Sequence, residues 1–405
     1  MNRLAESYVK LVLALGEHDR DFVDAYYGPP QWRDGIKLAG MSLDAIQQSA
    51  KGIREQLLGT SVDPADEMQQ LRKHYLVKQL EAVLARVEML EGKRLSFDEE
   101  AQALYDAEPP RHTEDDFKGI LRSLDGLLPG TGPTTQRYEQ FRKAFIIPGE
   151  RLDTVFRAAI TECRKRTKKH IELPSSENFV LEYVKNKSWS GYNWYKGESY
   201  SLIQINADLP IYIDRAVDLA AHEGYPGHHV YNTLLEQHLA KRLNWVEFTV
   251  YALFSPQSLI AEGTANFGIE VALPGNERVE FEREVFFPLA GMDSEQADRY
   301  YQIHQLAAKL NYAHNEAARG YLDGIFGREQ AEEFLVSYAL MSADRARQRV
   351  RFIDTYRSYV INYNLGQDLV RRYIESHGGT ADRPDKRWEE FKQLLSSPRL
   401  PSQLR

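Results

Sequence analysis

Two short segments near the middle of the chain gather the residue types that bind zinc, so the fold has to bring them together. The first runs from Asp218 to His229 (Asp-Leu-Ala-Ala-His-Glu-Gly-Tyr-Pro-Gly-His-His), and the second runs from Leu259 to Ala265 (Leu-Ile-Ala-Glu-Gly-Thr-Ala). Imidazole nitrogens and carboxylate oxygens are ligands of zinc, and such an ion can activate a bound water. No other part of the sequence gathers comparable chemistry.

The first segment departs from the usual helical zinc motif, His-Glu-x-x-His, in which two histidines lie one turn apart. Pro226 stands where the second histidine would be, and in an unbroken helix it would clash with the carbonyl of His222. We therefore expect the Tyr-Pro-Gly segment to loop out or to kink the helix, with Gly227 supplying backbone freedom. Extrusion of two residues would bring His228 to the position of the second histidine, and extrusion of three would bring His229.

We predict one zinc ion, bound by His222, His228 and Glu262. On an unbroken helix His222 and His229 would lie two turns apart, about 10 Å along the axis. That separation is awkward for two nitrogens that must each lie about 2.0–2.1 Å from one ion. His229 therefore remains the alternative ligand or a residue that supports the site. Glu223 is the predicted general base, close enough to accept a proton from the water without binding the metal.

The prediction for Glu262 depends on its surroundings in the sequence. Apolar residues at helical spacing between Ser258 and Ile269 indicate a helix that carries this carboxylate inward. A buried carboxylate must be paired or metal-bound, because burying it alone is costly. The alternative is a glutamate that caps or pairs on a helix surface. Its position downstream of the His-Glu and His-His pairs favours the metal.

These segments resemble the signature of a known family. His-Glu-x-x-Pro-Gly-His-His from His222, followed by Glu-Gly-x-Ala from Glu262, is similar to the signature of a widespread bacterial family of unknown function, which is grouped with the gluzincin-type zinc metallopeptidases. The family often has a further glutamate seven residues after the second segment begins, where this chain has Ile269, so no role is assigned there. The resemblance covers mainly residues 191–366. It implies a largely helical, metallopeptidase-like fold with an uncharacterised substrate.

A weaker resemblance lies toward the C-terminus. Arg351-Phe352 and the Tyr-Asn-Leu-Gly segment from Tyr363 resemble the family's Arg-Tyr and Tyr-Lys-Ile-Gly elements, although the Pro-Gly-Gln usually found between them is missing. Peptide hydrolysis generates an oxyanion that a tyrosine, histidine or arginine can stabilise, and we nominate Tyr363 for this role. Other side chains on the C-terminal helices that could do the same are Tyr301, His304, Tyr312, His314, Arg345, Arg347, Arg349, Arg351, Tyr356 and Tyr359.

Periodicity predicts a mainly α-helical fold with a small antiparallel sheet next to the active-site helix. The linker-like stretch Leu128–Pro133 separates an N-terminal helical region, 1–130, from a metal-binding region, 131–405, and we expect one continuous fold. An exposed edge strand of the sheet could pair with an extended peptide. The predicted helices include 3–27, 42–58, 64–90, 150–169, 294–318, 328–339 and 342–363, and the predicted strands are 179–184, 192–195 and 201–206.

Charge and cysteine content narrow the class of partner. A net charge of −8 and a pI of about 5.8 argue against nucleic acid or an anionic membrane as the main partner. The single cysteine, Cys163, excludes an intramolecular disulfide and fits a reducing compartment. The N-terminus lacks the features of a signal peptide, and no run of about 18 apolar residues occurs, so we expect a bacterial cytoplasmic protein.

Together these features predict a zinc-dependent hydrolase, most simply a metallopeptidase that cleaves peptides or other small amides with Glu223 as general base. The alternatives are a non-catalytic metal-binding protein, in which the extruded Pro-Gly spoils the catalytic geometry, and a metal-free helical scaffold. The sequence does not predict the oligomeric state or the length of the substrate.

Overall fold

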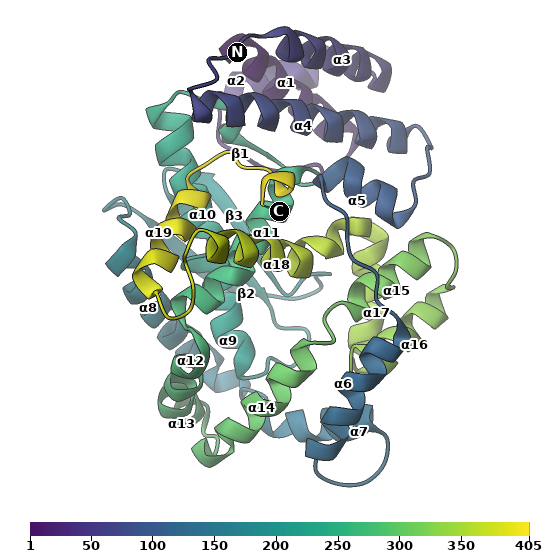
Figure 1. Cartoon of the computed structure of the whole chain (residues 1–405), viewed down its shortest axis with the longest axis vertical. Coiled ribbons are helices and arrows are strands. Elements are labelled where there is room, and N and C mark those ends of the chain that lie inside the picture. The colour runs from purple at the N-terminus through teal and green to yellow at the C-terminus, as the bar shows by residue number, and fades with distance from the viewer. Residues whose placement is uncertain (405) are drawn as a thin grey trace.

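The computed structural model describes residues 1–404 and shows a mainly α-helical protein with two small sheets (Figure 1). None of the helices within residues 1–404 is long and apolar enough to cross a membrane. The α-helices are α1 (Asn2–His18), α2 (Pro30–Ala39), α3 (Leu43–Gly59), α4 (Glu67–Leu90), α5 (Phe97–Tyr105), α6 (Glu114–Leu127), α7 (Thr134–Arg142), α8 (Leu152–His170), α9 (Asp214–Leu219), α10 (His228–Leu235), α11 (Pro256–Ala272), α12 (Gly275–Phe281), α13 (Phe287–Ala290), α14 (Ala297–Ala308), α15 (Ala313–Leu322), α16 (Arg328–Tyr338), α17 (Ala343–Tyr356), α18 (Ile361–Ser376) and α19 (Pro384–Leu395). The strands are β1 (Val23–Tyr26), β2 (Asn178–Val184), β3 (Gly191–Gly197), β4 (Tyr200–Asn206) and β5 (Val250–Ala252).

The first helices form a layer at one end of the molecule, at the top of Figure 1, where α1, α3 and α4 pack on one another. Helix α3 begins where the sequence predicts, because the Ser42 side chain accepts a hydrogen bond from the amide of Ala45. Helix α1, however, ends at His18 rather than near residue 27. The following residues form β1, which pairs antiparallel with β5. This partner lies more than 200 residues away, so the local spacing of apolar residues does not reveal it.

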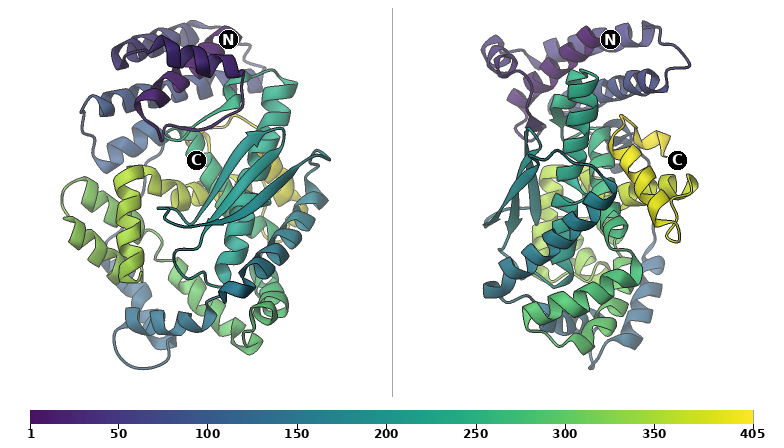
Figure 2. Two further views of the ribbon diagram at one scale, coloured as in Figure 1. Left: turned by 180° about the vertical axis from the view of Figure 1, so that it is seen from behind. Right: turned by 90° about the vertical axis from the view of Figure 1, so that its left-hand side faces the viewer.

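The predicted small sheet is present, but it is mixed rather than antiparallel. Its strand order is β2-β4-β3, with β2 parallel to β4 and β3 antiparallel to β4. Glu198 and Ser199 both have positive φ and connect β3 to β4 as a tight hairpin. Strand β2 cannot pair with β3, because β4 lies between them. The sheet covers one side of the central helices, and β3 is left as an edge strand (Figure 2).

Helices α11 and α18 form the central helix pair, and two glycines let them approach closely. A Cβ added to Gly263 would lie 2.5 Å from the backbone of Gly366, and one added to Gly366 would lie 2.7 Å from the carbonyl oxygen of Leu259. The two backbones therefore touch where Glu262 precedes the first glycine and Tyr363 lies one turn before the second. The crossing fixes the side chains of both helices relative to each other.

One hydrophobic cluster runs through the whole molecule. It contains buried side chains from Ala5 in α1 to Leu404 at the end of the described chain, and it includes α4, α8, α10, α11 and α18. Smaller clusters around Phe117 and around Leu335 hold the peripheral helices α6, α7 and α14–α17. The core therefore continues across residue 130, where the sequence suggests a linker.

Candidate metal centre

The helix that carries the first histidine is interrupted directly after it. From α9 the chain continues into a π-helical turn, Ala220–Gly224, and the amide of Gly227 then donates to the carbonyl of Ala221 at 2.9 Å. This bond spans six residues instead of the four of an α-helix, so the turn contains two extra residues. A Cβ on Gly227 would lie 1.9 Å from the carbonyl oxygen of His222, and only glycine fits there. Helix α10 then begins at His228, as expected for the extrusion of two residues.

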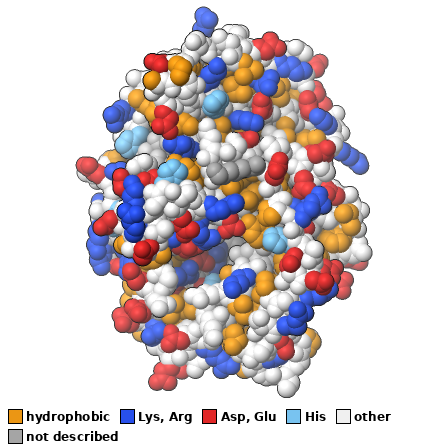
Figure 3. Space-filling view, in the orientation of Figure 1, with side chains coloured by type: hydrophobic (Ala, Val, Ile, Leu, Met, Phe, Trp, Pro, Cys, Tyr) orange, Lys and Arg blue, Asp and Glu red, His pale blue; other side chains and the backbone are white. Residues whose placement is uncertain are grey.

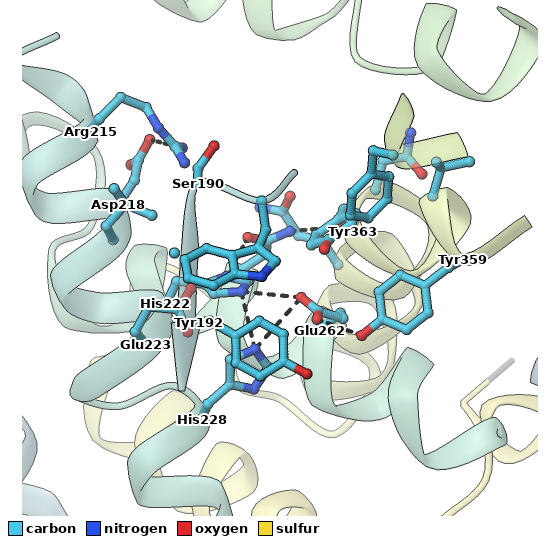
Figure 4. A pocket seen from close by; sticks show the side chains of 18 of the residues that line it. Ser190, Tyr192, Arg215, Asp218, His222, Glu223, His228, Glu262, Tyr359 and Tyr363 are labelled. Atoms are coloured by element: carbon cyan, nitrogen blue, oxygen red, sulfur yellow. Dashed lines mark hydrogen bonds and ion pairs between the residues drawn. The ribbon is translucent and has the colours of Figure 1, made fainter. Parts of the chain in front are cut away.

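Three potential ligand atoms converge at this break (Figure 4). His222 Nε2 lies 3.1 Å from His228 Nε2, and Glu262 Oε2 lies 3.1 Å from the first nitrogen and 3.6 Å from the second. Ligands about 2.0–2.1 Å from one zinc ion in a tetrahedron lie roughly 3.3–3.4 Å apart. Glu262 Oε2 is also buried without a hydrogen-bond partner among residues 1–404. The three side chains therefore fit one tetrahedral ion with a further position open.

Two polar side chains hold this cluster in place. Asn266, one turn after Glu262 on α11, accepts a hydrogen bond at 2.9 Å from Nδ1 of His222. A proton on Nδ1 leaves the Nε2 lone pair free to bind a metal. The hydroxyl of Tyr359 donates to Glu262 Oε1 at 2.7 Å, which leaves Oε2 directed at the histidines (Figure 4). Asn266 also donates to the main-chain carbonyl of Tyr363, which ties the cluster to α18.

The charges within the cluster shift the pKa values of His228 and Glu262 in opposite directions. Burial opposes the charged form of His228, but the Glu262 carboxylate beside it raises the pKa of His228 to about 9. Burial likewise opposes ionisation of Glu262, but the two histidines hold the pKa of Glu262 well below its usual range. The site is thus built to keep Glu262 ionised, as a metal ligand has to be.

Glu223, the predicted base, lies beside the cluster and lines the same cavity. Its carboxylate contacts the start of β3 so closely that a Cβ on Gly191 would lie 2.7 Å from Glu223 Oε1. The side chain of Asn193 in β3 donates to the main-chain carbonyl of Glu223 at 2.7 Å. Burial raises the pKa of Glu223, and the neighbouring histidines oppose that increase. Within the described chain its carboxylate accepts no hydrogen bond, so it is available to a water or a substrate.

His229 takes no part in this cluster, so the prediction of an alternative ligand is wrong. Its side chain is fully buried on the other side of α10, where Nδ1 lies 2.9 Å from Ser201 Oγ and Nε2 lies 3.3 Å from Glu177 Oε2. Both ring nitrogens are thereby occupied. Adjacent helical residues point in directions about 100° apart, so His228 and His229 cannot both face one ion.

The candidate oxyanion stabilisers separate into two groups. Tyr363 lines the cavity with its ring centroid 6.3 Å from that of His222, and its hydroxyl has no hydrogen-bond partner in residues 1–404. Six other candidates also line the cavity: His304, His314, Arg345, Arg349, Tyr356 and Tyr359. The remaining four do not line it: Tyr301, Tyr312, Arg347 and Arg351.

The cavity has a volume of about 470 Å³. Its walls come from the edge of β3, from α9 and the broken turn (residues 220–227), from α11, and from the C-terminal helices α17 and α18. The cavity is therefore large enough for several residues of a peptide or a small molecule of similar size.

Comparison with known proteins gives a fold and no activity. No family model and no curated protein matches the chain. Among solved structures, two proteins described as putative lipoproteins are similar: one from Colwellia psychrerythraea (TM-score 0.56, 16% identity, covering 90% of this chain and 68% of that one) and one of unknown function from Shewanella oneidensis (TM-score 0.45, 12% identity, 90% and 76%). A crystal structure of a protein called BsuCP is also similar (TM-score 0.49, 11% identity, 98% and 88%). At 16% identity the likeness to the first shows the fold alone.

Proposed function

We propose that this chain is a zinc-dependent hydrolase, and that its substrate is a peptide or another small amide. The observation that carries the proposal is the triangle of His222, His228 and Glu262 donor atoms, with sides of 3.1–3.6 Å, beside the free carboxylate of Glu223. Zinc held by these three residues would supply a Lewis acid that polarises a carbonyl and makes water acidic. The signature segment supports membership of the gluzincin-type family named above.

The protein's own groups supply the proton transfers. Glu223 accepts the proton of the attacking water and returns it to the leaving amine, and burial raises the pKa of this carboxyl, which makes its carboxylate a stronger base. The hydroxyl of Tyr363, which has no partner within the described chain, can donate a hydrogen bond to the oxyanion that forms on the substrate carbonyl. The Asn266 and Tyr359 side chains fix the ligands, so little reorganisation is needed during the reaction.

A free strand edge supports a peptide as the substrate. The first residues of β3, Gly191–Asn193, line the cavity, and β3 has no strand paired on its outer side. An extended peptide could form main-chain hydrogen bonds to such an edge and run past Glu223. The single cysteine, Cys163, can form no intramolecular disulfide, which fits a reducing compartment such as the bacterial cytoplasm.

Metal analysis and a peptide digest test this proposal. Protein freed of any histidine tag should contain about one zinc per chain, and Glu262→Ala should lose it. Glu223→Gln should keep the zinc but stop cleavage of a mixed peptide library. Glu270→Gln is the matched control, because Glu270 lies on α11, lines the same cavity and pairs with Arg371 instead of the histidines. It should keep both zinc and activity.

The alternatives give different results. A metal-free scaffold would contain no zinc in the wild-type protein. A non-catalytic metal protein would bind zinc and cleave nothing. Equal cleavage by wild type and Glu223→Gln would remove the proposed base.

A further inference from the structure

Two arginines on α17 face the cavity without an acidic partner. Arg345 and Arg349 lie one helical turn apart, and both line the cavity that contains the histidine cluster. Arg349 makes no hydrogen bond or ion pair within residues 1–404, and its guanidinium lies 5.2 Å from the ring centroid of Phe352. Arg345 donates only to the main-chain carbonyl of Pro210, at 2.6 Å. Neither of these partly buried cations forms an ion pair within residues 1–404, although Asp214 opposes from a distance the lowering of the pKa of Arg345 by burial, and an unpaired buried cation is costly unless a ligand supplies the counter-charge.

The other arginines of the cavity are paired. Arg215 lies 3.1 Å from Asp218, and Arg278 lies 2.8 Å from Asp218 and 2.7 Å from Glu282. Burial lowers the pKa of Arg349, as does the nearby guanidinium of Arg215. The surplus of positive charge is therefore confined to the wall formed by α17.

This surplus is unusual for the chain. The net charge is −8, and acidic and basic side chains are mixed over the face shown in Figure 3. On the outward side of α17, the exposed Arg347 pairs with Asp344 on the same helix. Arg345 and Arg349 differ from Arg347 in facing the cavity and in having no acid to pair with.

Two aromatic rings connect Arg349 with the histidine cluster. The ring of Phe352, which Arg349 contacts, is 6.2 Å from the ring of Tyr363, and Tyr363 is 6.3 Å from His222. Arg349 also faces His314, and burial together with this guanidinium lowers the pKa of His314 to about 3. His314 is therefore neutral at neutral pH and does not add to the charge on this wall.

We propose that Arg349 and Arg345 bind a carboxylate of the substrate, so that the enzyme acts on short peptides held by an anionic group. A guanidinium is suited to this role because its planar donors match a carboxylate. The carboxylate can be the peptide C-terminus or an acidic side chain near the scissile bond. This inference rests on the proposed function, because it assigns a substrate class to the same cavity.

Binding of a defined peptide set to the Glu223→Gln protein tests the inference without requiring catalysis. The set contains N-acetylated tripeptides as free acids, the same peptides as C-terminal amides, and amides with one Asp or Glu. Ultrafiltration and mass spectrometry measure how strongly each peptide is retained. Free acids, acidic amides, or both should be enriched about 10-fold or more over neutral amides, and Arg349→Ala should abolish the enrichment. The enriched class identifies the source of the carboxylate.

Two further variants serve as controls. Arg347→Ala, on the exposed side of the same helix, should keep the enrichment, and Arg349→Lys should keep part of it because the charge remains. No enrichment of any acidic peptide, or enrichment that survives Arg349→Ala, would overturn the inference. Failure of the proposed function is read separately, from the zinc content and from the digest by the wild-type protein.

Discussion

His228 and His229 are adjacent in sequence but lie in different surroundings. Replacing each of them in turn therefore tests which single residue binds the metal. We expect His228→Ala to lose the zinc, because its Nε2 is one corner of the ligand triangle. His229→Ala should keep it but should lower the free energy of unfolding by about 2–4 kcal/mol, because Glu177 and Ser201 lose their buried partner. Zinc content and urea unfolding in the presence of EDTA measure the two effects. The reverse pattern, with zinc lost only from His229→Ala, would contradict the assignment.

Asn266 should matter for metal affinity although it does not touch the metal. Without its hydrogen bond the His222 ring can rotate, and its Nδ1 proton is no longer fixed. We therefore expect Asn266→Ala to bind zinc about 10–100-fold more weakly. Competition with a zinc-binding dye measures the affinity. Asn311→Ala is the control, because Asn311 lines the cavity without contacting the triangle; equal affinities of the two variants would show that Asn266 has no such role.

The sequence predicts the histidines and the glutamate that can bind a metal, because these residue types occur together at a recognisable spacing. It does not single out Tyr359 or Asn266, whose residue types are common and whose roles depend on their position in the fold. His222, His228 and Glu262 are gathered as their spacing indicates. In the sequence Tyr359 is one of several equivalent candidates, because only the crossing of α11 and α18 directs its hydroxyl at Glu262. Asn266 carried one usable signal, its position one turn after Glu262 on the same face.

Among the elements, the broken turn before α10 depends most on a single residue. We expect Gly227→Ala to destabilise the protein by roughly 3 kcal/mol or more and to abolish zinc binding, because its Cβ would overlap backbone atoms of His222 that cannot move independently. Gly52→Ala, in the middle of α3 with open space around it, should instead be neutral or stabilising by up to about 1 kcal/mol. Thermal unfolding with and without zinc measures both. A stable, zinc-binding Gly227→Ala protein would mean that the turn has another way to close.

The sequence predicts the positions of the strands in the small sheet but not how they pair. The three predicted strands lie within β2, β3 and β4, because β-branched and aromatic residues cluster there. Their pairing was wrong, since strand order is decided by how the sheet packs on the helices and not by the strands themselves. The residues of β1 have a helical spacing of apolar side chains. They form a strand because they pair with β5, and local spacing does not reveal this partner because it is distant in sequence.

Glu177 joins α8, the broken turn and α10, and it should make stability depend on pH. Burial raises its pKa, but hydrogen bonds from His229, Tyr225 and Arg164 outweigh burial and lower the pKa to about 2, from 4.5 in the unfolded chain. A lowered pKa adds stability that is present above pH 4.5 and is lost as the pH falls toward 2. Glu177→Gln should therefore cost about 3 kcal/mol at pH 7, and this difference should shrink below pH 4.5.

Urea unfolding of wild type and Glu177→Gln between pH 7 and pH 3 measures this dependence. Glu55→Gln, on the exposed side of α3, is the control. A difference between wild type and Glu177→Gln that stays constant down to pH 3 would show that the carboxylate charge is not what the three donors stabilise.

At the scale of the whole molecule, the N-terminal helices are connected to the metal-binding region by more than apolar contacts. The predicted linker near residue 130 does not separate two cores, since one hydrophobic cluster extends from Ala5 to Leu404. Within this cluster Arg72 of α4 forms a bidentate ion pair with Glu247, at 2.5 and 3.0 Å, and both side chains are almost fully buried. Arg72 also lies over the ring of Trp245 and donates to Asn2.

This ion pair should make the N-terminal layer unfold together with the rest. Removal of one partner leaves a buried charge, so Glu247→Leu should lower the free energy of unfolding by about 3–5 kcal/mol. The double variant Arg72→Met with Glu247→Leu should be more stable than Glu247→Leu alone, because no unpaired charge remains. Glu6→Gln, which breaks the exposed Lys10–Glu6 pair, should change stability by less than about 0.5 kcal/mol. Hydrogen exchange of the amides of α1, α3 and α4 in urea, compared with loss of zinc, tests the coupling. The two transitions should coincide in wild type, and earlier exchange with zinc still bound would mean that the layer unfolds alone.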